Sequence, residues 1–271
     1  MHCRYCEQDG IIEREHIIPK FIYKYQKESG DRFIGWNERA NDIIGGEATI
    51  ADVCKTCNGG ALSFLDDYGS QFLARNGFLT QLYLKTQTTI TYDYHLLLRW
   101  LMKISYNSAS AVNDPSTHIF GAYKDYILRG EPLPSEKDVM LFAGLLMPLK
   151  LTDEQKSELN IPTSEDNLCS PFKMRITKND PVLLRSGIIL KGIFFGSIFF
   201  YLVITEKSAL ISKSYLKNKI IKNEKVKLIN PSSSEMLLPN CGKNWITASE
   251  TQLKKEISNL GMEHIHKKLK I

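Results

Sequence analysis

Two adjacent residues near the N-terminus, Glu15 and His16, have side chains that can bind a metal ion and move a proton. They lie in the segment EREHIIPK, which covers residues 13–20. A glutamate carboxylate is a hard oxygen ligand of the kind that Mg²⁺ or Mn²⁺ prefers, and histidine gains and loses a proton near neutral pH. Either Glu15 and His16 are ordinary surface residues, or they hold a metal ion and a water molecule against a phosphate.

Two Cys-x-x-Cys pairs lie on either side of this segment, Cys3/Cys6 and Cys54/Cys57. Zn²⁺ takes four thiolates in a tetrahedron, and a two-residue gap lets a tight turn present both sulfur atoms of a pair to one ion. The 47 residues between the pairs must double back as a hairpin if both pairs are to reach the same ion. We therefore expect a structural zinc at the four cysteines. Because such a site is coordinatively closed, any catalysis must use other residues.

Residues next to these motifs could complete a phosphate site. Asn58 follows the second cysteine pair directly, and the spacing of apolar residues after it predicts a helix that begins near it. Asn is a preferred residue at a helix N-terminus, and Gly59-Gly60 leaves room for a phosphate to approach the backbone N–H groups there. At the end of the first motif, Pro19 ends the expected strand and Lys20 adds a positive charge.

In combination, these motifs resemble the zinc-stapled branch of the HNH endonucleases, which have the ββα-metal fold. The motifs that carry the resemblance are Cys3-Arg-Tyr-Cys6, Glu15-His16-Ile17-Ile18-Pro19-Lys20, Cys54-Lys-Thr-Cys57-Asn58 and Leu65-Asp66. They cover roughly residues 1–70, about a quarter of the chain. The combination is specific, whereas a lone Glu-His or a lone Cys-x-x-Cys would not be.

The resemblance implies a phosphodiester hydrolase that uses one divalent cation, Mg²⁺ or Mn²⁺. On this interpretation Glu15 and Asn58 hold the cation, and His16 is the general base that activates water. Asp66 is a further ligand or a supporting group, and Lys20 is a candidate phosphate contact. DNA is the expected partner, with RNA left open. By analogy with the family, a role in bacterial restriction or antiviral defence would suit such a protein.

One position departs from the usual motif. Many members carry an asparagine five residues before the third cysteine, where it orients the base histidine, and this chain has Thr49 there. Thr49 itself, Asn37 or Asn41 from the connecting segment, or a backbone carbonyl could orient His16 instead. The departure keeps open a second interpretation, a catalytically decayed zinc-stapled module that binds nucleic acid. A third interpretation is an interaction protein in which zinc folds a docking surface.

The composition is that of an ordinary soluble globular protein. Of the 271 residues, 43% are hydrophobic and 24% are charged, which is not the composition of a disordered or fibrous chain. The longest apolar run, residues 192–204, is shorter than the roughly 20 residues that a membrane-spanning helix needs, so we expect buried strand there. With polar residues in place of an N-terminal leader, we expect a cytoplasmic protein without a membrane partner.

The charge is distributed unevenly along the chain. Residues 1–75 carry nine Lys and Arg against 12 Asp and Glu, whereas residues 76–271 carry 26 against 18. The net positive charge of residues 76–271 suits contact with nucleic-acid phosphates. A charge of this size is equally compatible with a role in solubility alone.

We expect an α+β protein in two parts. Residues 1–75 form the HNH module, with turns and a long loop over 30–46 and a strand over 48–53. Residues 76–271 form an accessory α+β domain of unknown role, helical to about residue 135 and strand-rich after it. This second part could bind a partner protein or a second copy of the chain.

Within residues 76–271 the pattern predicts individual elements. Apolar spacing predicts an amphipathic helix from residue 93. Further elements are expected as helices over 116–128 and 251–269 and as strands over 139–149, 172–177, 181–195 and 197–205. The lysine-rich segment 212–228 is interpreted as the solvated face of a strand or helix, or as a phosphate-contacting surface.

Overall fold

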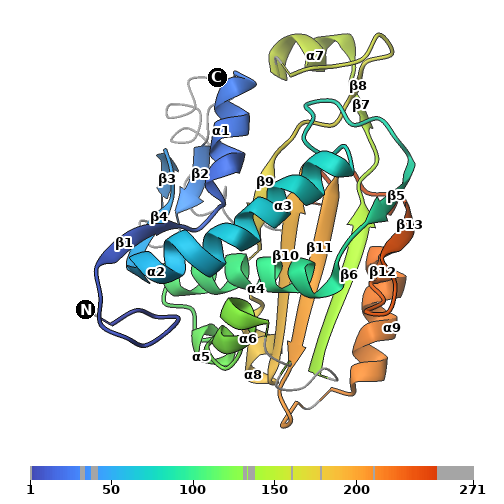
Figure 1. Cartoon of the computed structure of the whole chain (residues 1–271). Helices are drawn as coiled ribbons and strands as arrows, with labels where there is room; N and C mark the ends of the chain where they lie inside the picture. The colour runs from blue at the N-terminus through green and yellow to red at the C-terminus, as the bar shows by residue number, and fades with distance from the viewer. Residues whose placement is uncertain are drawn as a thin grey trace.

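The computed structural model describes most of the chain, and its elements are a mixture of helices and strands (Figure 1). The described residues are 2–30, 34–37, 42–130, 133, 138–159, 161–177, 179–209 and 211–248. The expected α+β class is confirmed, and the HNH module itself stays a prediction. No helix within these ranges is both long enough and apolar enough to cross a membrane.

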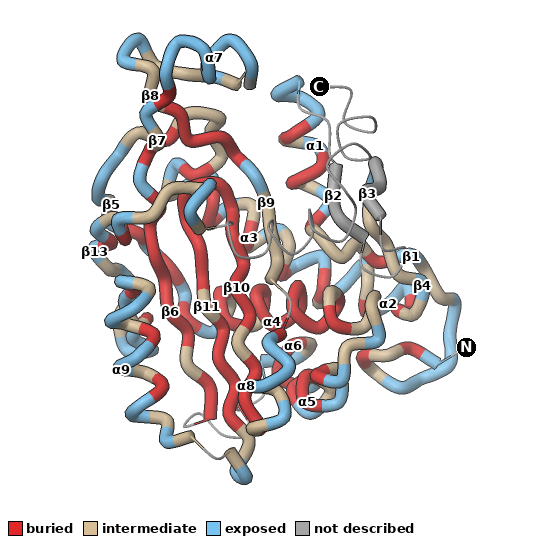
Figure 2. The backbone as a smooth tube through the Cα atoms, turned by 180° about the vertical axis from the view of Figure 1, so that it is seen from behind, coloured by how far each residue is buried: buried red, intermediate tan, exposed pale blue. Residues whose placement is uncertain are grey.

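A five-stranded antiparallel sheet is the scaffold of the larger part of the molecule. Its strand order is β12-β6-β11-β10-β9, with bounds β6 (Val139–Leu145), β9 (Met174–Ile176), β10 (Ile188–Phe195), β11 (Ile198–Thr205) and β12 (Lys227–Leu228). Nearly every residue of β6, β10 and β11 is buried (Figure 2). These strands are buried on both faces and therefore have no polar side, which explains the unbroken apolar run in the sequence.

Helices cover both faces of this sheet. Phe200 of β11 belongs to the same hydrophobic cluster as α4 (Tyr94–Ala111), whereas its neighbour Phe199 belongs to the cluster with α9 (Lys213–Glu224). Because adjacent side chains of a strand point to opposite faces, α4 and α9 lie on opposite sides of the sheet.

Helix α4 is the central element between the sheet and the N-terminal segment (Figure 1). The helix predicted from residue 93 is confirmed, and the Asp93 carboxylate caps it by accepting a hydrogen bond from a backbone N–H of the first turn (2.9 Å). The Trp100 ring stacks on Phe195 of β10, with ring centroids 4.8 Å apart. Helix α3 (Ser63–Arg75) approaches the same indole at Gly69, where a Cβ atom would overlap the ring. Since α4 is buried along most of its length, its polar side chains need partners inside the protein.

The N-terminal residues fold around a two-stranded antiparallel ladder. β1 (Ile12–His16) pairs with β4 (Thr49–Cys54), and a bulge between Glu13 and Arg14 shifts the register. The strand expected before the third cysteine is confirmed. The helical elements that follow the two strands are α1 (Lys20–Glu28) after β1, then α2 (Lys55–Cys57), the π-helical turn η1 (Asn58–Leu62) and α3 after β4.

Two of the expected segments contain a different type of element in the structure. The segment 30–46, expected as turns and a long loop, contains the antiparallel pair β2 (Ile34–Asn37) and β3 (Asp42–Gly45). Its glycines and asparagines obscure the alternation that marks a strand. The segment 181–195, expected as strand throughout, begins with helix α8 (Pro181–Arg185), because the Asp180 carboxylate accepts two backbone N–H groups and proline suits a first helical turn.

The remaining described elements are short. They are β5 (Gln87–Thr91) paired with β13 (Glu235–Pro239), α5 (Thr117–Gly121), α6 (Lys124–Arg129), β7 (Leu149–Lys150), α7 (Asp153–Leu159) and β8 (Leu168–Cys169). Helices α5 and α6 confirm the helical stretch over 116–128. The lysine-rich segment is α9 followed by β12, and the expected helix over 251–269 lies outside the described residues. The division at residue 75 stays a prediction, and the larger hydrophobic core contains residues from both sides of it.

Candidate functional site

The four cysteines of the two Cys-x-x-Cys pairs come together, as their spacing predicts. Their Sγ atoms lie within 4.8 Å of one another. Cys3 and Cys6 come from the N-terminal turn, and Cys54 and Cys57 come from the end of β4 and from α2. The backbone N–H of Cys57 donates to the Sγ atom of Cys54 (3.5 Å), which is how a two-residue gap turns the chain. The cluster can hold a metal ion, and its four thiols are compatible with a structural zinc.

Burial and hydrogen bonds shift the pKa values of the thiols in this cluster in different directions. Burial and the neighbouring cysteine side chains raise the pKa of the Cys57 thiol, and burial raises the pKa of Cys6. Burial also acts to raise the pKa of Cys3, but backbone hydrogen bonds at Cys54, Cys6 and Tyr5 outweigh it and lower that pKa to about 7. A divalent cation would stabilise the thiolate form of such crowded, partly desolvated thiols.

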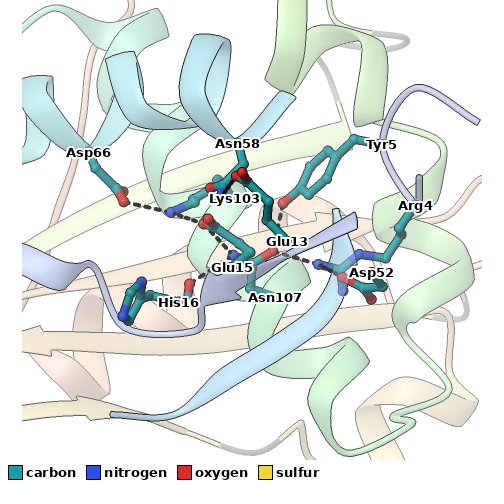
Figure 3. A network of polar contacts seen from close by, with 10 residues as sticks. All are labelled: Arg4, Tyr5, Glu13, Glu15, His16, Asp52, Asn58, Asp66, Lys103 and Asn107. Carbon is teal, nitrogen blue, oxygen red and sulfur yellow. Dashed lines mark hydrogen bonds and ion pairs between the residues drawn. The ribbon is translucent and has the colours of Figure 1, made fainter. Parts of the chain in front are cut away.

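The Glu15 carboxylate is buried and forms an ion pair with a lysine from α4 (Figure 3). The Nζ atom of Lys103 lies 2.5 Å from Glu15 Oε1 and 2.8 Å from Asp66 Oδ2. Burial acts to lower the pKa of Lys103, but the two carboxylates outweigh it and raise that pKa, so the ammonium is charged. The structure therefore brings together Glu15 and Asp66, two of the predicted cation ligands, and the positive charge between them is Lys103.

Asn107 of α4 makes a second buried polar contact with β1. Its Nδ2 group donates to Glu15 Oε1 (3.2 Å) and to the backbone carbonyl of His16 (3.1 Å). Its Oδ1 atom accepts from the Tyr5 hydroxyl and from Arg4 Nη2, both at 2.8 Å. The amide thereby ties β1 both to α4 and to the turn that carries the first cysteine pair.

Lys103 and Asn107 are site residues that the sequence analysis missed. They are four residues apart on α4, so they project from one face of the helix. Lys103 lies three residues after Trp100 and Asn107 lies seven residues after it, so all three lie on the buried face of α4. The signal that could have found them was the presence of a lysine and an asparagine on an otherwise apolar stripe, where each needs an internal partner.

The His16 side chain lies on the opposite side of β1 from Glu15, as the alternation of a strand requires (Figure 3). Its Nε2 atom lies 2.7 Å from Glu47 Oε2, and its ring packs against Tyr23 of α1 with centroids 5.9 Å apart. The side chain of His16 is 21% exposed and that of Glu47 is 50% exposed. Lys20, the predicted phosphate contact, is the exposed first residue of α1. A partly exposed histidine held by a carboxylate has the arrangement of a general base.

The partner of the His16 ring is therefore Glu47, which the sequence analysis did not consider. Thr49 is the cross-strand neighbour of His16 in the β1–β4 ladder. The side chain of Asn37 and the whole of Asn41, the other residues considered for this role, lie outside the described residues.

Asn58 does not begin the helix that follows the second cysteine pair. The helix begins three residues earlier, at Lys55, because the Cys54 side chain already accepts a backbone N–H group as its N-cap. Asn58 opens the π-helical turn η1, and its Nδ2 group donates to Glu13 Oε2 (3.0 Å). Its hydrogen-bond partner on β1 is thus Glu13 and not Glu15.

Replacing Asn107 with alanine should lower the free energy of unfolding by about 2–4 kcal/mol, because several buried polar groups lose their partner at once. Urea unfolding followed by circular dichroism measures this change. The control is Ser108→Ala, one residue further along the same helix, which should change stability by less than about 0.5 kcal/mol. Equal stability of Asn107→Ala and the wild type would show that the amide network does not hold β1 on α4.

Comparisons with known proteins gave no match: no family model, no curated protein and no solved structure matches this chain.

Proposed function

We propose that the protein is an endonuclease of the HNH type that hydrolyses phosphodiester bonds of DNA. The observation that carries the proposal is the pair of His16 and Glu47, with Nε2 and Oε2 2.7 Å apart and the histidine side chain partly exposed. His16 is the last residue of β1 and belongs to the motif that resembles the HNH family, whereas Glu47 lies two residues before the start of β4. A role in restriction or antiviral defence would suit such an enzyme by family analogy.

In the proposed reaction, His16 removes a proton from the water that attacks the phosphorus atom, the P–O bond to the leaving sugar oxygen breaks, and that oxygen takes a proton from solvent. The Glu47 carboxylate accepts a hydrogen bond from Nε2–H of the ring, which leaves Nδ1 as the nitrogen that takes the proton from water. As the imidazole becomes positively charged, the Glu47 carboxylate stabilises it. Asn107 holds the backbone carbonyl of His16 (3.1 Å), so the strand that carries the base is fixed from the inside of the protein.

Two metal ions are part of the proposal. The cysteine cluster would hold a structural zinc, which is closed to substrate by its four thiolates. The carboxylates of Glu15 and Asp66 converge on one point and are hard oxygen ligands that suit Mg²⁺ or Mn²⁺. Glu15 and Asp66 would hold that cation, which when bound neutralises charge that builds up on phosphate oxygens, and Asn58, the third predicted ligand, would have to leave Glu13 to join them.

The second candidate function is a nucleic-acid-binding module without cleavage. One observation favours it: Lys103 already neutralises part of the charge of Glu15 and Asp66 inside the protein. The basic excess of residues 76–271 suits either function. Incubation of the purified protein with supercoiled plasmid DNA, with Mg²⁺ or Mn²⁺ and then with a chelator, separates the two, because only the nuclease produces nicked or linear plasmid.

Substituting alanine for His16 should reduce plasmid cleavage by about 10²–10⁴-fold, since the general base is lost, while zinc content and the unfolding curve stay as in the wild type. Gel densitometry of samples taken along a time course gives the rate of plasmid cleavage. The matched variant Glu47→Gln keeps the shape of the partner but not its charge, and it should reduce the rate by a smaller factor. Cleavage by His16→Ala at the wild-type rate would refute the mechanism.

Substituting serine for Cys54 should abolish the cooperative unfolding transition and the bound zinc, because binding of a structural zinc contributes directly to the free energy of folding. Elemental analysis of the purified protein and a thermal melt measure the two effects. Cys169→Ser, at a buried cysteine outside the cluster, is the control and should keep one zinc per chain. A Cys54→Ser protein with full zinc content and an unchanged melt would contradict the assignment.

A further inference from the structure

A lysine ammonium occupies the point at which the two candidate cation ligands meet. The side chain of Lys103 is fully buried, and its Nζ atom lies 2.5 Å from Glu15 Oε1 and 2.8 Å from Asp66 Oδ2. The three residues come from different elements, α4, β1 and α3 (Figure 3). Lys103 lies 37 residues beyond Asp66 in the chain, outside the motifs on which the resemblance to HNH enzymes rests.

The charges at this point decide what else can bind there. Two carboxylates and one ammonium leave one negative charge uncompensated. A divalent cation in place of the ammonium would balance both carboxylates. A divalent cation beside the ammonium would be repelled at close range, where the dielectric screening of the protein interior is weak. Lys103 and a divalent cation are therefore alternatives at the same pair of carboxylates.

We propose that the Lys103 ammonium competes with divalent ions for the carboxylates of Glu15 and Asp66. It thereby sets the affinity of these two carboxylates for Mg²⁺ and Mn²⁺. The inference deepens the proposed function and rests on it only for the choice of the two ligands. An ion can enter only when the Lys103 side chain leaves its carboxylates, so the free energy of that displacement is subtracted from the intrinsic affinity of the two carboxylates.

The test is a titration of the zinc-loaded full-length protein with MnCl₂, in which the electron paramagnetic resonance signal of free Mn²⁺ reports how much is bound. No nucleic acid is present. Lys103→Met removes the ammonium and keeps an unbranched side chain of similar length, and it should lower the Kd for one Mn²⁺ at least about tenfold relative to the wild type. Adding Glu15→Gln to this variant should abolish the gain in affinity for Mn²⁺.

The matched control is Lys191→Met, which removes a buried lysine of β10 whose Nζ donates to the Thr177 carbonyl (3.2 Å). It should leave the Kd for Mn²⁺ unchanged. Lys103→Gln is the second variant, because removal of the ammonium exposes Glu15 and Asp66 to each other and can lower stability. If both Lys103 variants unfold on their own, a thermal melt with and without Mn²⁺ replaces the titration, and recovery of a cooperative melt with Mn²⁺ supports the proposal.

The proposal is overturned if the Lys103 variants fold and bind Mn²⁺ no more tightly than the wild type, or if they stay unfolded with Mn²⁺ present. It is also overturned if the wild type binds one Mn²⁺ as tightly as Lys103→Met does. None of these results depends on cleavage. If the wild type does not cleave DNA but Lys103→Met binds Mn²⁺ tenfold more tightly, the proposed nuclease activity is rejected. The competition between Lys103 and divalent ions is then still established.

Discussion

The buried ion pair between Lys103 and Glu15 joins the parts of this protein that are far apart in sequence. A charged group removed from water is stable only beside an opposite charge, so α4 can pack against β1 only in the register that places these two side chains together. Asp66 adds α3 to the same point. One turn further along α4, Asn107 completes the attachment of β1 through its backbone and through the N-terminal turn. The candidate site is thus built on the helix that also forms the centre of the hydrophobic core.

The two candidate catalytic residues have different environments because they are adjacent in a strand. The Glu15 side chain points inward, to Lys103 and Asn107, whereas His16 points outward, to Glu47 and solvent. The His16 side chain is therefore partly exposed, whereas the Glu15 carboxylate is buried. This difference follows from the alternation of side chains along β1.

The sequence was sufficient for the features that depend on local spacing. Cys-x-x-Cys spacing predicted the cysteine cluster, and apolar periodicity predicted β4 and α4. Contacts between residues distant in the chain, such as Asn107 with Glu15 and Lys103 with Asp66, leave no periodic signal, so they emerged only from the fold. The family motif pointed to Thr49 as the partner of His16, whereas the residue that contacts the ring is Glu47, two positions earlier. No sequence pattern marks that contact. The β2–β3 pair was missed because its glycines and asparagines are typical of turns.

A double-mutant cycle of Lys103→Met and Glu15→Gln, followed by urea unfolding, tests most directly the claim that this ion pair organises the site. In Lys103→Met the two carboxylates lose their shared cation, in Glu15→Gln the Lys103 ammonium keeps only Asp66, and the double variant removes both charges of the pair. If the pair holds β1 on α4, the coupling free energy between the two substitutions is about 2–3 kcal/mol. A coupling below about 0.5 kcal/mol, the range found for independent residues, would show that the pair does not hold β1 and α4 together and would contradict the account.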